Sequence, residues 1–200
     1  MSQPRPDEIG VGVKVGDKFT YQVVDYVDAL ADVSLSEFST GLNKTNCCTI
    51  EITNVESSLV SYTGTIQFRN GTIFSYDNVI NIETGISPYA GGFFGIYAAN
   101  LTIGHLSRPG YSEGVAIDDT LTRTYIDGDR QTNFFHVEDE FYDTDDPNFY
   151  RSCYVFTYVH FDRQIGILVE LKEMSIFNDP QITLTTEWKL VDSNVLQIPP

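Results

Sequence analysis

The sequence predicts an all-β protein, mainly an antiparallel meander that forms a curved sheet, a half-barrel or a sandwich, with one or two short helices. The chain of 200 residues contains 12 Tyr and 13 Phe, and Val, Ile and Thr are also frequent, a composition that suits pleated, half-buried surfaces. Apolar residues recur mostly with a period of two, which is the spacing of a strand. Turn-forming dipeptides separate these runs. The length fits one domain.

Four alternating runs in the first half predict strands, over residues 13–24, 48–55, 59–68 and 72–82. Asn70-Gly71 lies between the last two runs and predicts a tight hairpin turn, because a type I′ turn requires positive φ. Residues 28–38 have apolar side chains near helical spacing and are one candidate for a short helix. Residues 96–101, which follow a stretch rich in Gly and aromatic residues, are the other candidate.

The second half reads as a series of hairpins. The predicted strands cover residues 120–126, 130–137, 152–161, 165–174 and 181–191. Asp127-Gly128 predicts a second tight turn, and we expect a positive φ at both turn glycines. In the last strand the alternation predicts that one set of side chains packs into the core: Ile182, Leu184, Thr186, Trp188 and Leu190.

The run from Cys153 to Phe161 is apolar on both faces. A sheet with one solvated face does not need such a strand, so we expect it to be covered on both sides or to line a concavity. The aromatic residues Tyr154, Phe156 and Tyr158 share one face and are therefore the predicted face for an apolar ligand.

The charge balance excludes some partners. The formal net charge is −16, which would repel the phosphate backbone of nucleic acid and anionic lipid surfaces. The chain has no stretch of about 18 apolar residues that could span a membrane. We find no HExxH, GxSxG or phosphate-loop motif, and the sequence therefore predicts no catalytic residues and no enzyme.

Acidic residues are concentrated in residues 138–146, which we interpret as a loop. Calcium binds six to eight oxygen ligands, many of them carboxylates, so Asp143, Asp145 and Asp146 are candidate metal ligands. The spacing does not match an EF-hand, and a solvated acidic loop is the alternative. No other cofactor is expected.

The cysteines allow one disulfide. Cys47 and Cys48 are adjacent, and neighbours on a strand point to opposite faces, so only one of the two could meet Cys153. We name Cys48 and Cys153 as the candidate pair, with three reduced thiols as the open alternative. Asn43, Asn70 and Asn100 each begin an Asn-x-Thr sequon and are candidate glycosylation sites, although turn formation already explains Asn70.

Several short segments carry a resemblance to a known group. They are VKVGDKFTY at residues 13–21, ANLTIGHL at 99–106, TRTYIDGDRQTNF at 122–134, YVHFDRQIGILVEL at 158–171 and TTEWKLVDSNVLQIPP at 185–200. Together they resemble archaeal exported cell-surface proteins of unknown function. Those proteins combine a signal peptide, a β-rich ectodomain and a Pro-Glu-Phe-type C-terminal tail with a membrane helix. His105, Phe161 and Ile165 depart from the residues usual in that group.

The resemblance implies an extracellular, cell-surface protein held by a C-terminal membrane anchor that lies outside this sequence. It supplies no catalytic residues. We accordingly divide the chain into an N-terminal extension at residues 1–10, one ectodomain at 11–192 and the start of a tether at 193–200.

Two functions compete at this point. The first is a non-catalytic surface or envelope module that binds an unknown surface protein or a glycan. The alternative is a carrier or sensor of an apolar ligand in a half-barrel concavity, like that of lipoprotein carriers. A hydrolase with a carboxylate pair and a filament subunit remain further alternatives. An apolar pocket of roughly 300 Å³ or more would favour the carrier.

Overall fold

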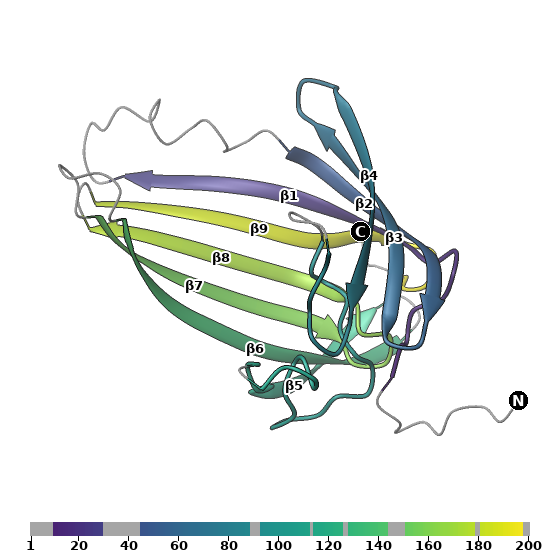
Figure 1. The fold of residues 1–200 in the computed structure, drawn as a ribbon. Helices are drawn as coiled ribbons and strands as arrows, with labels where there is room; N and C mark the ends of the chain where they lie inside the picture. Colours follow the sequence, from purple (N-terminus) through teal and green to yellow (C-terminus); the bar gives the residue numbers. More distant parts are fainter. Residues whose placement is uncertain are drawn as a thin grey trace, which may run out of the picture.

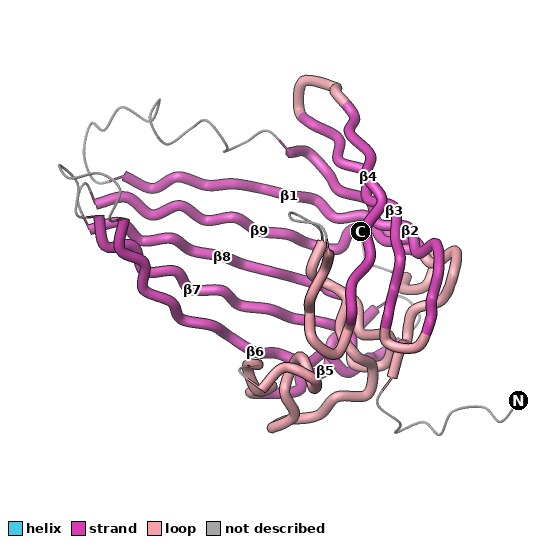
Figure 2. The backbone as a smooth tube through the Cα atoms, in the orientation of Figure 1, coloured by secondary structure: helices cyan, strands magenta, loops and turns pink. Residues whose placement is uncertain are grey.

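The computed structural model describes residues 10–29, 45–88, 93–112, 114–125, 128–143, 151–178 and 181–197. All regular elements in these ranges are strands, as Figures 1 and 2 show. The nine strands are β1 (Lys18–Ala29), β2 (Thr45–Glu56), β3 (Leu59–Phe68), β4 (Ile73–Asn81), β5 (Asp119–Tyr125), β6 (Gly128–Asp143), β7 (Arg151–Asp162), β8 (Leu168–Asn178) and β9 (Gln181–Ser193). The predicted all-β class is confirmed.

The strands form one antiparallel sheet with the order β4-β3-β2-β1-β9-β8-β7-β6-β5. Two meanders, β1 to β4 and β5 to β9, join through the pairing of the first strand with the last. The sheet does not close, so β4 and β5 are its two edges. Sequential pairing therefore accounts for every neighbour except the β1–β9 pair, which is a contact between the ends of the fold.

The predicted helix at residues 96–101 is wrong. Ile96 instead forms an isolated bridge with Ile167, and Ala99 forms one with Gly10. These backbone groups find partners on neighbouring segments, so the stretch needs no helical hydrogen bonds. The other candidate, residues 28–38, begins within β1 and otherwise lies outside the described residues.

The two predicted hairpins form, with positive φ at both glycines. Gly71 has a φ of 85° and Gly128 a φ of 119°. The second hairpin differs in register, because Tyr125 pairs with Gly128. Gly128 therefore already belongs to β6.

A long connection between β4 and β5 covers one end of the inner face of the sheet. Its apolar side chains are buried against the strands, among them Ile96, Ala98, Leu101 and Ile117. Figure 1 shows this connection over one end of the sheet, while the opposite halves of β1, β9, β8 and β7 have no described element drawn over them. Leu196 is also fully buried, so the packed part of the chain extends beyond the boundary predicted at residue 192.

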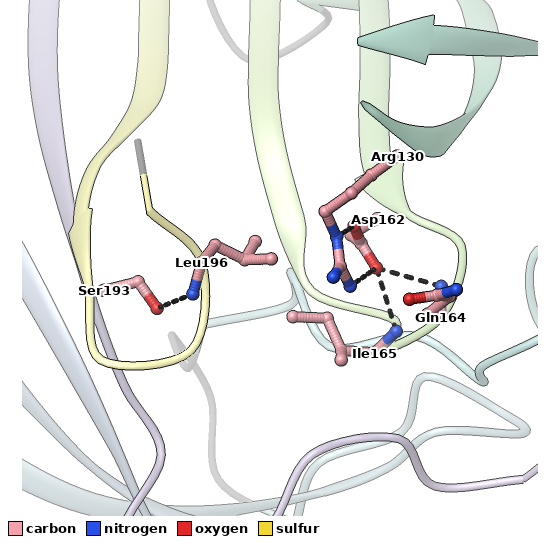
Figure 3. Close-up of polar contacts among 6 residues, drawn as sticks. All are labelled: Arg130, Asp162, Gln164, Ile165, Ser193 and Leu196. Atoms are coloured by element: carbon pink, nitrogen blue, oxygen red, sulfur yellow. Dashed lines mark hydrogen bonds and ion pairs between the residues drawn. The ribbon is translucent and has the colours of Figure 1, made fainter. Parts of the chain in front are cut away.

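A buried carboxylate organises the turn between β7 and β8. Asp162 has no exposed surface and accepts two hydrogen bonds from Arg130, at 2.6 and 3.0 Å. It also accepts the backbone N–H groups of Gln164 and Ile165, as Figure 3 shows. The same view shows Ser193 accepting the N–H of Leu196 at the end of β9. These side-chain acceptors hold both chain reversals in place.

The connection between β4 and β5 packs against the β7–β8 turn. Gly166 has a φ of 70°, and a Cβ at this position would lie 2.1 Å from the carbonyl oxygen of Tyr97. The Tyr97 N–H donates to the Gly166 carbonyl at 2.7 Å. Only glycine combines this conformation with such a close approach of two backbones.

Candidate functional site

An apolar hollow of about 220 Å³ lies on the inner face of the sheet, where the connection begins to cover β8 and β9. It is lined by Phe93, Phe94, Gly95, Tyr97, Leu168, Leu171, Glu173, Thr186 and Trp188. We call it the inner hollow. Most of its lining is aromatic or aliphatic, as is usual for sites that bind small molecules.

The backbone at residues 93–97 is fixed by hydrogen bonds to the sheet. The hydroxyl of Tyr62 accepts from the Phe93 N–H at 2.6 Å and donates to the Phe93 carbonyl at 3.1 Å. The Leu168 N–H donates to the Gly95 carbonyl at 2.7 Å. A Cβ at Gly95 would lie 2.4 Å from the Phe93 ring, so this position has no room for a side chain.

Arg108 holds the same segment from behind. Its guanidinium donates to the carbonyl oxygens of Phe94 and Ile96 and lies 4.2 Å from the centre of the Tyr97 ring. Burial lowers the pKa of Arg108 from its usual value. Because its donors are directed to backbone carbonyls, we assign this arginine a structural role.

Trp188 forms one wall of the inner hollow. Its ring centre lies 6.2 Å from that of Phe93 and 6.3 Å from that of Tyr21. The Tyr21 hydroxyl donates to the Leu168 carbonyl at 3.0 Å, which fixes the tyrosine behind the wall. The aromatic surface is therefore formed before any ligand arrives.

The rim of the inner hollow is polar. Thr186 donates to the Asp25 carboxylate at 2.8 Å, and Glu173 is opposite Thr186 in the ladder between β8 and β9. An apolar floor with acidic groups at its edge suits a ligand that inserts an apolar group and leaves a polar end in solvent.

The alternation predicted for β9 is confirmed in part. Ile182 and Leu190 are buried, whereas Leu184 and Trp188 are only half-buried. Residues 183, 185 and 187, which alternate with the predicted core set, are also half-buried. Trp188 is thus a surface of the hollow as well as part of the core.

A second hollow, of about 360 Å³, lies on the opposite face of β6, β7 and β8. We call it the outer hollow, and its lining residues are Phe134, Tyr158, His160, Glu170, Lys172 and Met174. The two hollows share β8 because successive side chains of a strand point to opposite faces.

Nearly parallel rings line the outer hollow and its border. Phe134 and His160 have ring centres 4.8 Å apart at 30°, and His136 and Tyr158 have centres 6.4 Å apart at 20°. These pairs are cross-strand neighbours of β6 and β7. Burial, together with the charge of Arg123, lowers the pKa of His160 from its usual value, so the ring is neutral near pH 7.

Two ion pairs flank these rings. Arg123 reaches Glu170 at 2.9 Å, and Lys172 reaches Glu187 at 3.4 Å. Both pairs are partly exposed, so they contribute little to stability. The two ion pairs place charged hydrogen-bond donors and acceptors beside the aromatic surface of the outer hollow.

The predicted apolar-ligand face is divided by the structure. Tyr154 is exposed, Phe156 is half-buried, and only Tyr158 lines a hollow. The inner hollow was not predicted, because its Phe93 to Tyr97 wall lies in a segment that shows no strand period. The cluster of aromatic residues with glycines was the signal for a close approach of backbone to sheet.

The predicted acidic loop is wrong over most of its length, since β6 continues to Asp143. Glu138 and Glu140 lie on one face of this strand and Asp139 on the other. Asp145 and Asp146 lie outside the described residues. Among the residues that the structure describes, no three His, Cys, Asp or Glu side chains are grouped to hold a metal ion.

The predicted disulfide is not formed, because Cys47, Cys48 and Cys153 are all free thiols. Cys48 is on β2 and Cys153 on β7, with β1, β9 and β8 between these strands. Four strand spacings exceed the Cα separation of about 7 Å that a disulfide tolerates. Burial raises the pKa of the Cys48 thiol to about 12, and the neighbouring Cys47 thiol adds to this rise.

The sequons lie in different settings. Asn70 is exposed in the β3–β4 hairpin, and its side-chain oxygen accepts the Thr72 N–H at 2.9 Å. Asn100 is half-buried with a φ of 61°. Asn43 lies outside the described residues.

Comparison with known proteins gives no relative: no family model, curated protein or solved structure matches this chain. In the described part of the chain, no helix is long and apolar enough to cross a membrane. The function must therefore be argued from the two hollows.

Proposed function

We propose that this chain is a non-catalytic binding module whose inner hollow accepts an apolar group of its ligand. The observation that carries the proposal is the preformed aromatic wall of Trp188, Phe93 and Tyr97 around an apolar floor. Such a concave, mostly apolar surface with a few polar groups is the usual form of a small-molecule site.

The volume limits the size of that group. A cavity of about 150 Å³ lined by aliphatic and aromatic side chains binds benzene, so the inner hollow, at about 220 Å³, suits one or two fused aromatic rings or one branched alkyl group. It is smaller than the volume set for a carrier of whole apolar molecules. The rest of the ligand would lie along the rim, near Asp25 and Glu173.

The absence of catalytic motifs in the sequence supports a binding role. The titratable residues of the inner rim lie on an open sheet surface, and the ion pair between Arg130 and the buried Asp162 is engaged in forming a turn. A general acid or base must instead lie within hydrogen-bond reach of the substrate atom to or from which it transfers a proton.

Naphthalene titration with Trp188 fluorescence as the signal tests this proposal, because the chain has one Trp. We expect a saturable change in emission. Leu171→Phe, whose larger side chain fills part of the hollow, should weaken the response. Lys189→Phe, on the opposite face of β9, is the matched control and should leave it unchanged. Folded protein whose emission does not respond to naphthalene would refute the proposal.

A glycan site in the outer hollow is the second candidate function. The stacked cross-strand pairs Phe134–His160 and His136–Tyr158 favour it. A sugar ring can lie against an aromatic face while its hydroxyls bond to charged groups such as Glu170 and Lys172. Calorimetric titration with neutral oligosaccharides should give heat that Tyr158→Ala abolishes and Tyr154→Ala retains. The absence of heat with all of them would exclude this candidate.

We further propose that the module works outside the cell, at the cell surface. The charge of −16 and the three sequons support this location. Native mass spectrometry of the protein from its own source would detect attached glycans at Asn70. Unmodified protein recovered from the cytosol would contradict the proposal.

A further inference from the structure

The edge strand β4 is protected along only half of its length. It pairs with β3 on one side, and no strand among the described residues pairs with its other side. An open edge offers unpaired N–H and C=O groups to any other extended chain. Its protection can be followed residue by residue.

The half of β4 near its C-terminal end is capped. The Val79 N–H donates to the Asn78 side chain at 2.7 Å, and the Asn81 N–H donates to the Ile86 carbonyl at 3.0 Å. Both N–H groups therefore point away from β3. Because alternate residues of an antiparallel strand point to the same side, the N–H groups of Ile73, Ser75 and Asp77 also point away from β3.

In the other half, Ile73 to Asp77, no described residue caps the outward N–H groups, and apolar side chains are exposed. Ile73 is 64% exposed and Phe74 is 54% exposed. Phe74 stacks on Tyr76 with ring centres 5.9 Å apart at 22°. The stretch contains neither Lys nor Pro, which usually guard such edges. Its one charge, Asp77, accepts a hydrogen bond from Thr63 of the same sheet at 2.6 Å.

We propose that residues 73–77 pair with the same residues of a second copy of this chain, in an antiparallel arrangement centred on Ser75. In this register Ile73 is opposite Asp77 of the partner, and Phe74 is opposite its Tyr76. Each residue whose backbone N–H points away from β3 is then opposite such a residue of the partner, as an antiparallel ladder requires. The pairing length equals the uncapped stretch, because the Asn78 cap prevents its extension.

The self-complementary register favours a second copy over an unrelated strand. A two-fold axis through Ser75 brings two aromatic cross-strand pairs together and places no two carboxylates opposite each other. The net charge of −16 on each copy opposes association. Since salt screens this repulsion, the dimer should tighten as ionic strength rises.

Sedimentation velocity of the whole chain tests the proposal. A five-residue ladder is a small interface, so we expect a monomer–dimer equilibrium with a dissociation constant on the order of 0.1–1 mM, tighter at high salt. Ser75→Pro removes the outward N–H without touching the β3 ladder and should weaken association about tenfold or more. Ser75→Ala keeps that N–H and should associate like the parent.

Hydrogen exchange identifies the surface and covers the case in which Ser75→Pro fails to fold. The amides of Ile73, Ser75 and Asp77 should gain protection with protein concentration, and Phe74→Lys should abolish that gain. A parent that stays monomeric to about 1 mM overturns the proposal. So does a dimer whose three amides remain unprotected, because that dimer would use another surface or another strand.

Discussion

Replacement of Trp188 by Ala separates the structural and binding roles of the inner hollow. Truncation of a fully buried Trp costs about 3–5 kcal/mol. Trp188 is half-buried, with contacts to Tyr21 and Phe93 on one side and the hollow on the other. We therefore expect a loss of about 2 kcal/mol in the free energy of unfolding, roughly half of the full value. For a chain of this length that loss lowers Tm by about 4–8 °C.

The assay is thermal unfolding followed by circular dichroism, with Lys189→Ala as the control on the same strand. Lys189 is exposed, so its truncation should change Tm by no more than about 1–2 °C, as is usual for surface positions. Trp188→Phe should recover part of the stability. If Trp188→Ala melts with the parent, Trp188 does not pack as the structure shows, and the wall of the inner hollow is not preformed.

Three further predictions concern titratable groups. The pKa of His160 lies below its usual value, so the unfolded chain takes up the proton before the folded chain does. The stability that His160 contributes should be complete above about pH 6.5 and should fall as the pH decreases through the folded pKa. His160→Gln should reduce this pH dependence in melts recorded at decreasing pH. With a pKa of about 12, the buried Cys48 should stay unmodified by a thiol reagent at pH 8, while the half-buried Cys47 reacts. Mass spectrometry of the digested protein would measure the labelling of each cysteine, and equal labelling would contradict the burial of Cys48. Arg130→Met should destabilise the fold by about 3–5 kcal/mol, because it leaves the Asp162 carboxylate buried without its cationic partner. Urea unfolding should show that adding Asp162→Asn restores part of this loss. Strict additivity of the two changes would exclude a coupled pair.

The strands and turns were predictable because their signals are local. The alternation in residues 59–68 and 72–82 and the Asn70-Gly71 turn together require a hairpin, and the structure has it with Gly71 at positive φ. The acidic stretch shows the limit of such signals. Charged residues 138–140 resemble a loop, yet they continue β6, because the paired strand β7 supplies hydrogen bonds and apolar neighbours that composition does not reveal.

The inner hollow depended on contacts between distant parts of the chain. Phe93 reaches Trp188 only because Tyr62 and Leu168 hold residues 93–95 against the sheet, and no local pattern encodes that docking. The outer hollow likewise needs β6, β7 and β8 in one register. The predicted face of Tyr154, Phe156 and Tyr158 came from one strand alone, and only its Tyr158 lies where neighbouring strands supply a hollow.

By itself the sequence determined the class of this protein: its β-rich composition, its turns and its acidic surface follow from residue types and their spacing. The tertiary structure decided the pairing of β1 with β9, the use of the 93–117 connection as a core filling, and therefore the position of both hollows. The physical reason is that strand propensity and turn chemistry act over a few residues. Cavities and sheet edges, in contrast, form where segments far apart in the chain meet or fail to meet.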